Sequence, residues 1–187
     1  MYHVRGPAKR RRLRYPPSEN PHQALVHPAL GLADSFGLAF YKAQVAAQQT
    51  LPGEGTVLIT VNQKDKNAVL EVARRFEELG FKIKTTGGTC QFFAANGIAS
   101  EPILKMHEGR PNIVDGIKNG EIQLVINTPT GRLGTHDDSY IRKAAIKYKI
   151  PYITTVAAAV AAVKGIAAFR EGHGRARSLQ NYHADIR

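Results

Sequence analysis

Apolar and polar positions follow a repeating order from residue 56 to residue 169, in which short apolar runs alternate with longer segments of helical spacing. The expected strands span 56–61, 81–85, 103–104, 124–127 and 151–154. The expected helices span 65–78, 89–96, 113–118, 138–149 and 156–169. Short strands that are apolar on both faces and separated by helices are typical of a parallel sheet covered on both sides. The pattern predicts a small doubly wound α/β fold.

Helical spacing also predicts which side chains face the core. In the first helix of this series these are Val69, Val72, Ala73, Phe76 and Leu79. In the helix 138–149 they are Ile141, Ala144, Ala145 and Tyr148. Residues three and four positions apart lie on one helical face, so each set can pack against the sheet.

Three segments are expected along the chain. Residues 1–30 are basic and rich in proline, and we expect a disordered arm because nothing in them could bury a face. Residues 33–48 have the spacing of an amphipathic helix whose apolar face has little to cover it. Residues 51–55 indicate a linker, because proline and two glycines end a helix. We therefore divide the chain into an arm (1–30), a helical segment with its linker (31–52) and an α/β domain (53–187).

The net charge of +11 is unevenly distributed. Residues 1–52 carry seven Lys or Arg against two Asp or Glu, whereas residues 53–187 carry nineteen against thirteen. Nearly half of the excess therefore belongs to the first quarter of the chain. Because the basic arm contains no aromatic-interleaved motif of a known RNA or DNA module, a nucleic-acid-binding module is kept only as an alternative function.

The only cysteine, Cys90, excludes an intrachain disulfide framework, and no apolar stretch at the N-terminus precedes a cleavage site. Both features favour a cytoplasmic protein. The longest apolar segment, 156–169, is interrupted by Lys164 and Gly165 and is too short to span a bilayer. No membrane partner is expected.

Candidate binding residues gather where the expected strands end. Ligands of open parallel sheets bind outside the carboxyl ends of the strands, which here are Thr60, Thr86, Lys105, Asn127 and Thr154. Thr86 and Thr89 bracket two glycines where a strand turns into a helix, so hydroxyl and backbone N–H groups can converge on a phosphate. Lys66 and Lys105 can reach the same point as cations. The Asn127 amide is expected to be free to contact a sugar or a base.

Each of these residues also has a purely structural interpretation. The Thr-Gly-Gly-Thr turn could be an ordinary helix start with Thr89 as the N-cap, and both lysines could be solvated. Asp137 and Asp138 are expected to stabilise a helix N-terminus, although Asp137 could also touch a ligand. Their joint placement at strand ends favours a site. We find no catalytic residue, metal-binding set or ATP-binding motif, which suggests a sensor.

Several blocks make residues 62–187 similar to the C-terminal allosteric domain of the carbamoyl-phosphate synthase large subunit. The blocks are TTGGT, KMHEGRPNIVDGIKNGEI, LVINTPTGR, YIRKAA, IPYITTVAAA and RSLQNYHADI. The resemblance implies a methylglyoxal synthase-like fold with a five-stranded parallel sheet. Residues 31–52 resemble the last segment of the preceding synthetase domain, whereas residues 1–30 resemble neither part.

The resemblance also implies a set of binding residues. The family's pocket for a nucleoside monophosphate such as UMP or IMP maps onto Thr60, Lys66, Thr86, Gly87, Gly88, Thr89, Lys105 and Asn127, with Asp137 nearby. Pro129 stands where some members have a threonine, which leaves the preferred ligand open. Tyr152 and Thr154 match positions that contact ornithine in ornithine-regulated members.

By this resemblance the chain is a regulatory part of a glutamine-hydrolysing, ATP-dependent ligase that supplies the pyrimidine and arginine pathways. Its expected partners are the synthetase domains and the glutaminase small subunit. We expect no cofactor on this chain, since ATP and Mg belong to synthetase domains that 187 residues cannot hold. We therefore expect no synthase activity from this chain. We expect the chain to be a truncated gene product, a split subunit or the product of a reading frame opened within a longer gene. An uncovered helix at 33–48 would lead to self-association.

The main enzymatic alternative is a methylglyoxal synthase-type lyase. That enzyme has a histidine after its first strand and a catalytic aspartate in a Gly-Gly-Asp stretch. Here the first region reads Val61-Asn62-Gln63-Lys64, and Arg110 stands near the expected position of the aspartate. Removal of a carbon-bound proton requires a base, which this pattern does not provide.

Overall fold

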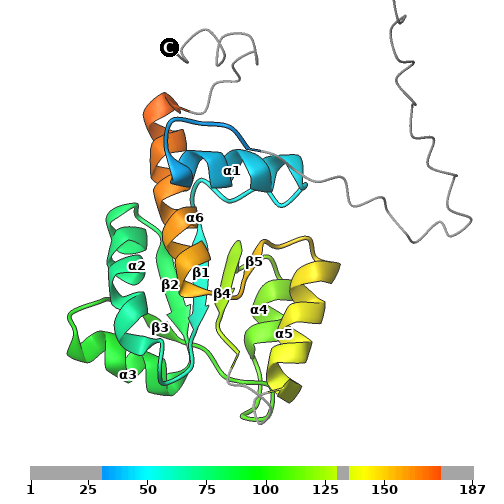
Figure 1. The fold of residues 1–187 in the computed structure, drawn as a ribbon. Helices are drawn as coiled ribbons and strands as arrows, with labels where there is room; N and C mark the ends of the chain where they lie inside the picture. Colours follow the sequence, from blue (N-terminus) through cyan, green and yellow to red (C-terminus); the bar gives the residue numbers. More distant parts are fainter. Residues whose placement is uncertain (1–30, 130–134, 174–187) are drawn as a thin grey trace, which may run out of the picture.

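Residues 31–129 and 135–173 are described by the computed structural model of the chain (Figure 1). The expected arm at 1–30, the segment 130–134 and the closing RSLQNYHADI block lie outside the described residues. Within the described part, no helix is long and apolar enough to cross a membrane.

Five parallel strands form one sheet, as the apolar runs predict. They are β1 (Thr56–Thr60), β2 (Lys82–Thr85), β3 (Glu101–Pro102), β4 (Leu124–Asn127) and β5 (Tyr152–Ile153). Their order is β3-β2-β1-β4-β5, so the chain winds outward in both directions from the central β1. Every residue of β1 and β4 is buried, which explains the apolar runs at 57–59 and 124–126. The register pairs Thr60 with Asn127 at the carboxyl ends of these two strands.

Helices cover both faces of the sheet (Figure 1). On one face lie α2 (Lys66–Glu78), α3 (Gly87–Ala95) and α6 (Val156–Ala168), and on the other lie α4 (Ile113–Lys118) and α5 (Thr135–Lys147). The predicted inward face of α2 is confirmed, because Val69, Val72, Ala73 and Phe76 are fully buried. Tyr148 follows the end of α5 and is exposed, so its predicted inward position is wrong.

The third strand lies earlier than predicted. The register pairs Lys84 with Glu101 and Thr85 with Pro102, while Leu104 forms only an isolated bridge to Asn112. β3 is an exposed edge strand, where a proline is tolerated because one side of the strand needs no hydrogen bond. The prediction from the apolar pair at 103–104 therefore places the strand two residues too late. Backbone pairing with β2, and not an apolar run, fixes the position of β3.

The helix after β2 also begins earlier than predicted. Its N-cap is Thr86, in an extended conformation, and α3 starts at Gly87. Thr89 is consequently a buried residue of the first turn and not the N-cap. Both glycines therefore belong to the helix and contribute their backbone N–H groups to its free N-terminus.

The helix before the linker, α1 (Phe36–Ala46), packs closely on α6 at the opposite end of the molecule from α3 (Figure 1). Gly37, Leu38 and Tyr41 are its buried residues. A Cβ atom on Gly165 of α6 would lie 2.4 Å from the Gly37 carbonyl oxygen. The expectation that this helix would lack a cover is therefore wrong, because glycines on both helices let the two backbones approach.

A short segment, η2 (Phe169–His173), kinked at Gly172, where φ is +85°, joins the end of α6 to distant segments. The Phe169 ring stacks on Tyr41 of α1, with 4.5 Å between the ring centroids. Arg170 donates to the carbonyl oxygens of Gly53 and Leu79, and its guanidinium lies over the Phe81 ring. This segment therefore holds the linker, the end of α2 and α1 together.

Candidate functional site

The turn from β2 into α3 presents an open helix N-terminus. Gly87 and Gly88 are exposed, whereas Thr86 and Thr89 beside them are mostly buried. The Thr86 side chain makes no capping hydrogen bond, so the first N–H groups of α3 are not occupied by that hydroxyl. Free N–H groups at the positive end of a helix attract anions.

Neither glycine is required by the conformation of the turn. Neither has a positive φ, and a Cβ atom on either residue would meet no atom within 4 Å. Glycine in a helix destabilises it by about 1 kcal/mol relative to alanine. Two glycines with open space before them are therefore unfavourable for folding alone, but they allow a ligand to approach the backbone closely.

Lys66 lies at the same point from the neighbouring helix. It is the first residue of α2, and its Nζ atom donates to the Gly88 carbonyl oxygen at 3.1 Å. The ammonium group also lies 5.6 Å from the centroid of the Phe92 ring. The predicted convergence of Lys66 on the glycine turn is thus seen in the structure.

A groove of about 380 Å³ adjoins the glycine turn on its other side. Its lining includes both glycines, Lys105 and Glu108. Glu108 accepts a hydrogen bond from the Lys105 backbone at 2.8 Å, which anchors the start of this loop. The structure therefore places Lys66, Lys105 and the turn 86–89 around one region of the surface.

A second group of candidate residues forms a partly buried polar cluster. Thr60 Oγ1 donates to Asn127 Oδ1 at 2.7 Å. Asn127 Nδ2 donates to Asp138 Oδ1 at 3.0 Å and to the Tyr152 hydroxyl at 2.8 Å. Burial, more than any other cause, raises the pKa of Tyr152 above its usual value, because a phenolate would be poorly solvated there. We call these four residues the Asn127 cluster.

This geometry corrects the expected role of Asn127. Both of its amide hydrogens are used within the protein, and only 3% of the residue is exposed. The expectation that the amide would be free to donate to a sugar or a base is therefore wrong. Sequence spacing could not show this, because Tyr152 arrives from β5 and Asp138 from α5.

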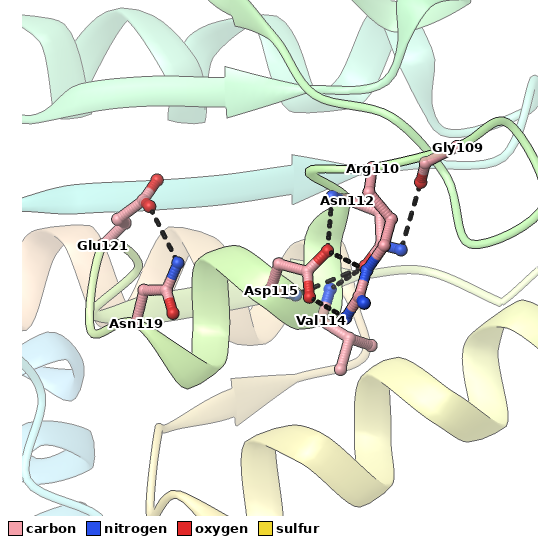
Figure 2. A network of polar contacts seen from close by, with 7 residues as sticks. All are labelled: Gly109, Arg110, Asn112, Val114, Asp115, Asn119 and Glu121. Atoms are coloured by element: carbon pink, nitrogen blue, oxygen red, sulfur yellow. Dashed lines mark hydrogen bonds and ion pairs between the residues drawn. The ribbon is translucent and has the colours of Figure 1, made fainter.

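The loop between β3 and α4 contributes two further contacts. His107 Nδ1 lies 3.1 Å from Asp137 Oδ2 at the start of α5, so Asp137 faces this loop. Arg110 binds Asp115 through two nitrogens, at 3.1 and 2.5 Å (Figure 2). These hydrogen bonds, followed by one from the Asn112 backbone, lower the pKa of the Asp115 carboxyl below its usual range.

Asn112 and Asp115 also form a capping box at the start of α4 (Figure 2). The Asn112 side chain accepts from the backbone of Val114 and Asp115, and the Asp115 carboxylate accepts from the Asn112 backbone. Arg110 thus supports a helix start. The hydrogen bonds from Arg110 to Asp115 explain the position of the Arg110 guanidinium through the fold, with no need for a ligand.

The remaining candidates lie apart from the glycine turn. Thr154 is exposed after β5, two residues beyond the half-buried Tyr152. Among the described residues, no group of three or more His, Cys, Asp or Glu side chains could hold a metal ion.

Sequence reasoning missed Asp138 and Glu108 as parts of these sites. The sequence predicts for Asp138 only an interaction with the helix dipole, and its position in the first turn of α5 is confirmed. Its hydrogen bond to Asn127 joins residues 11 positions apart, which no local pattern encodes. Glu108 lies within the KMHEGRPNIVDGIKNGEI block, and its spacing of three residues from Lys105 is compatible with a turn.

Comparison with known proteins identifies relatives of this chain. Residues 68–154 match the MGS-like domain family. The chain is 45% identical over 170 residues to the carbamoyl phosphate synthase large chain of Archaeoglobus fulgidus, covering 90% of this chain and 16% of that protein. It is 42% identical over 172 residues to the large chain, C-terminal section, of Aquifex aeolicus, covering 89% of this chain and 32% of that protein. The chain thus spans a third or less of the length of these relatives.

A solved structure of methylglyoxal synthase from Elizabethkingia anophelis NUHP1 shares the fold. The TM-score is 0.50 and the sequence identity is 15%, over 60% of this chain and 79% of that protein. This likeness confirms the methylglyoxal synthase-like architecture. At that identity it shows the fold alone.

Proposed function

Because the chain carries an MGS-like domain and is related over most of its length to carbamoyl phosphate synthase large chains, we propose that it binds a nucleoside monophosphate as a regulatory effector. The expected ligands are of the UMP or IMP type. The phosphate lies at the start of α3, with Lys66 and Lys105 on either side, and the nucleoside extends toward the Asn127 cluster.

The observation that carries this proposal is the open space in front of Gly87 and Gly88. Neither a positive φ nor a crowded neighbour requires glycine at these two positions. A phosphate at the helix N-terminus would explain both glycines, since its oxygens must come within hydrogen-bonding distance of the backbone. Lys66 beside Gly88 supplies a positive charge at the same place.

Regulation follows if the effector binds two arrangements of a larger assembly with different affinity. A coupling free energy of about 1–3 kcal/mol is typical of such effects. The proposed partners are the synthetase domains and the glutaminase small subunit of a carbamoyl phosphate synthase that serves pyrimidine and arginine synthesis. The chemistry belongs to those partners, so this chain alone is proposed to have no synthase activity.

Titration calorimetry of the full chain with UMP and IMP tests the proposal. Lys66→Ala and Lys105→Ala should each weaken binding about tenfold, because each removes a charge-assisted contact to the phosphate. Lys82→Ala is the matched control, since Lys82 is exposed at the opposite end of β2. A folded chain that binds neither nucleotide would exclude the proposed function, and equal effects of all three substitutions would exclude the proposed phosphate position.

Ornithine is titrated in the same series. Tyr152 and Thr154 are the residues proposed to contact it, and Thr154 is exposed at the carboxyl end of β5. Thr154→Val should weaken ornithine binding and leave UMP binding unchanged, because Thr154 makes no described contact with the glycine turn. Equal ornithine binding by the wild-type and Thr154→Val chains would exclude this second effector position.

A further inference from the structure

A second groove, of about 390 Å³, lies at the end of the sheet remote from the glycine turn. Its walls come from the carboxyl ends of α4 and α5 and from the residues that precede β1, β4 and β5. Each helix that joins two parallel strands runs back along the sheet, so helices end where strands begin. The length of the sheet therefore separates this groove from the glycine turn.

The groove has an apolar floor and a basic rim. Ile117, which lines it, is almost fully buried, whereas Lys118, Tyr148 and Lys149 are exposed around it. Among the described residues that line the groove, none is Asp or Glu. A third cation stands beside it, since Lys147 is exposed and its ammonium group lies 5.6 Å from the centroid of the Tyr148 ring.

Lys149 stands where three other helices that flank the sheet have glycine. Gly80, Gly97 and Gly120 follow the C-caps of α2, α3 and α4, with φ of +71° to +75°. Lys149 holds the corresponding place after α5, with a φ of +55°, and its N–H group donates to the Ile146 carbonyl oxygen. Because a side chain disfavours this conformation, lysine is a poorer choice than glycine for ending the helix.

Helix dipoles alone do not account for this much positive charge. The carboxyl end of a helix carries roughly half a negative charge, so α4 and α5 together contribute about one. Lys118, Lys147 and Lys149 bring three positive charges to the same place, and none of them forms an ion pair within the described ranges. The excess of positive charge favours an anionic occupant.

Charge and shape together select the kind of occupant. Residues 1–30 of the chain carry six Lys or Arg against one Glu, and a second copy would bring the same basic groove, so both are disfavoured by repulsion. A flat bilayer does not enter a recess, and a nucleic acid has no aliphatic side chain to place against Ile117 and Ile150. An acidic polypeptide segment supplies both carboxylates and aliphatic groups.

We propose that this groove is a docking site for a partner polypeptide segment that carries carboxylate and aliphatic side chains. Lys118 and Lys149 bind the carboxylates, and an aliphatic side chain lies against Ile117 and Ile150. The site goes beyond the proposed function, because it lies at the other end of the sheet from the proposed nucleotide position and does not depend on it.

Fluorescence anisotropy of the full chain with a labelled Glu-Leu-Glu-Glu-Leu-Glu peptide tests the proposal, with Gln-Leu-Gln-Gln-Leu-Gln as the matched peptide. The Gln peptide should bind about tenfold more weakly at low salt, because two exposed ion pairs are lost. NMR shifts caused by the Glu peptide should map to residues 117–123 and 148–151, and not to Gly87 and Gly88. Absence of binding, equal binding of both peptides, or shifts elsewhere would overturn the proposal.

Single substitutions locate the cations that bind the peptide. Lys118→Gln and Lys149→Gln should each weaken binding of the Glu peptide about threefold, as expected for one exposed ion pair. Lys64→Gln is the matched control, since Lys64 is exposed after β1 at the opposite end of the sheet. Equal effects of the three substitutions would overturn the proposed site.

Lys149→Gly separates docking from helix termination. The melting temperature should rise, because glycine adopts a positive φ more readily, while affinity for the Glu peptide should fall as in Lys149→Gln. Gln48→Gly is the control for the backbone effect, since Gln48 follows α1 with a φ of +60°. It should raise the melting temperature and leave peptide affinity unchanged. A lower melting temperature of Lys149→Gly with unchanged affinity would assign Lys149 to the fold and overturn its docking role.

Two further probes test the class of the occupant. Neither a ten-nucleotide oligouridylate nor phosphatidylserine vesicles should bind the groove more tightly than the Glu peptide does. Tighter binding of either probe that Lys118→Gln and Lys149→Gln weaken and Lys64→Gln leaves unchanged would overturn the polypeptide occupant in favour of a nucleic acid or a membrane.

Discussion

At the scale of single residues, the two glycines of the β2–α3 turn differ from glycines that the backbone conformation requires. Gly80, for example, has a φ of +75°, a backbone angle that residues with a side chain rarely adopt, so the backbone conformation there favours glycine. Gly88 has no such requirement and no neighbour that excludes a side chain. Its conformational freedom therefore destabilises the unliganded helix.

Gly88→Ala should separate stability from binding. We expect the free energy of unfolding to rise by about 0.5–1 kcal/mol, because alanine restricts the unfolded chain and favours the helix. Nucleotide affinity should fall, because the methyl group enters the space before the helix N-terminus. Thermal denaturation and calorimetric titration measure the two effects.

Gly80→Ala is the control for this prediction. The same change at a positive φ should lower stability by about 1 kcal/mol and leave nucleotide affinity unchanged. A Gly88→Ala chain that is stabilised and binds nucleotide as tightly as the wild type would show that the space before α3 is not a ligand position.

At the scale of elements, the α1–α6 contact depends on the absence of side chains where the helices cross. A Cβ atom on Gly165 would lie 2.4 Å from the Gly37 carbonyl oxygen and 3.0 Å from Tyr41 Cβ. Both distances are shorter than van der Waals contact, so α1 would have to move away from α6. The spacing of apolar residues predicted the two helices but not that they meet.

Gly165→Ala should therefore destabilise the chain by about 1–3 kcal/mol through overpacking, although alanine favours a helix by about 1 kcal/mol. Thermal denaturation checks the sign. In a chain that begins at residue 50, where α1 is removed, the same substitution should be stabilising. If Gly165→Ala stabilised both the full chain and the chain that begins at residue 50, α1 would not pack on α6 in solution.

At the scale of the whole molecule, Arg170 joins segments that are far apart in the sequence. Its guanidinium donates to the Gly53 carbonyl oxygen, 117 positions away, and to the Leu79 carbonyl oxygen, 91 positions away. These contacts attach the linker between α1 and β1 to the end of α2. Together with the stack of Tyr41 on Phe169, they make α1 part of the packed structure.

Arg170→Ala should loosen this attachment. We expect faster hydrogen exchange of backbone amides in residues 53–55 and a loss of stability of about 1 kcal/mol, because hydrogen bonds from a charged group to two carbonyls disappear. Arg74→Ala is the matched control, since within the described ranges Arg74 donates to the Asn96 carbonyl oxygen, 22 positions away, and to no more distant segment. Equal exchange in both variants would contradict a linking role for Arg170.

The sequence by itself determined the order of strands and helices, the parallel α/β class and the glycine turn with its two lysines. These features depend on periodicity, on backbone freedom and on the rule that parallel strands end at one edge, all of which are local or topological. The resemblance to a known family was carried by short blocks of residues and is confirmed by the match to the MGS-like domain family and to carbamoyl phosphate synthase large chains.

Only the tertiary structure decided which polar side chains remain available. Asn127 looked free at the end of its strand, but Asp138, Tyr152 and Thr60 reach it from three other elements and use its amide. The cover of α1 and the start of β3 likewise depend on distant backbone contacts. Hydrogen bonds and close packing between distant segments depend on three-dimensional placement, whereas hydrophobic periodicity reports only which face of each element is buried.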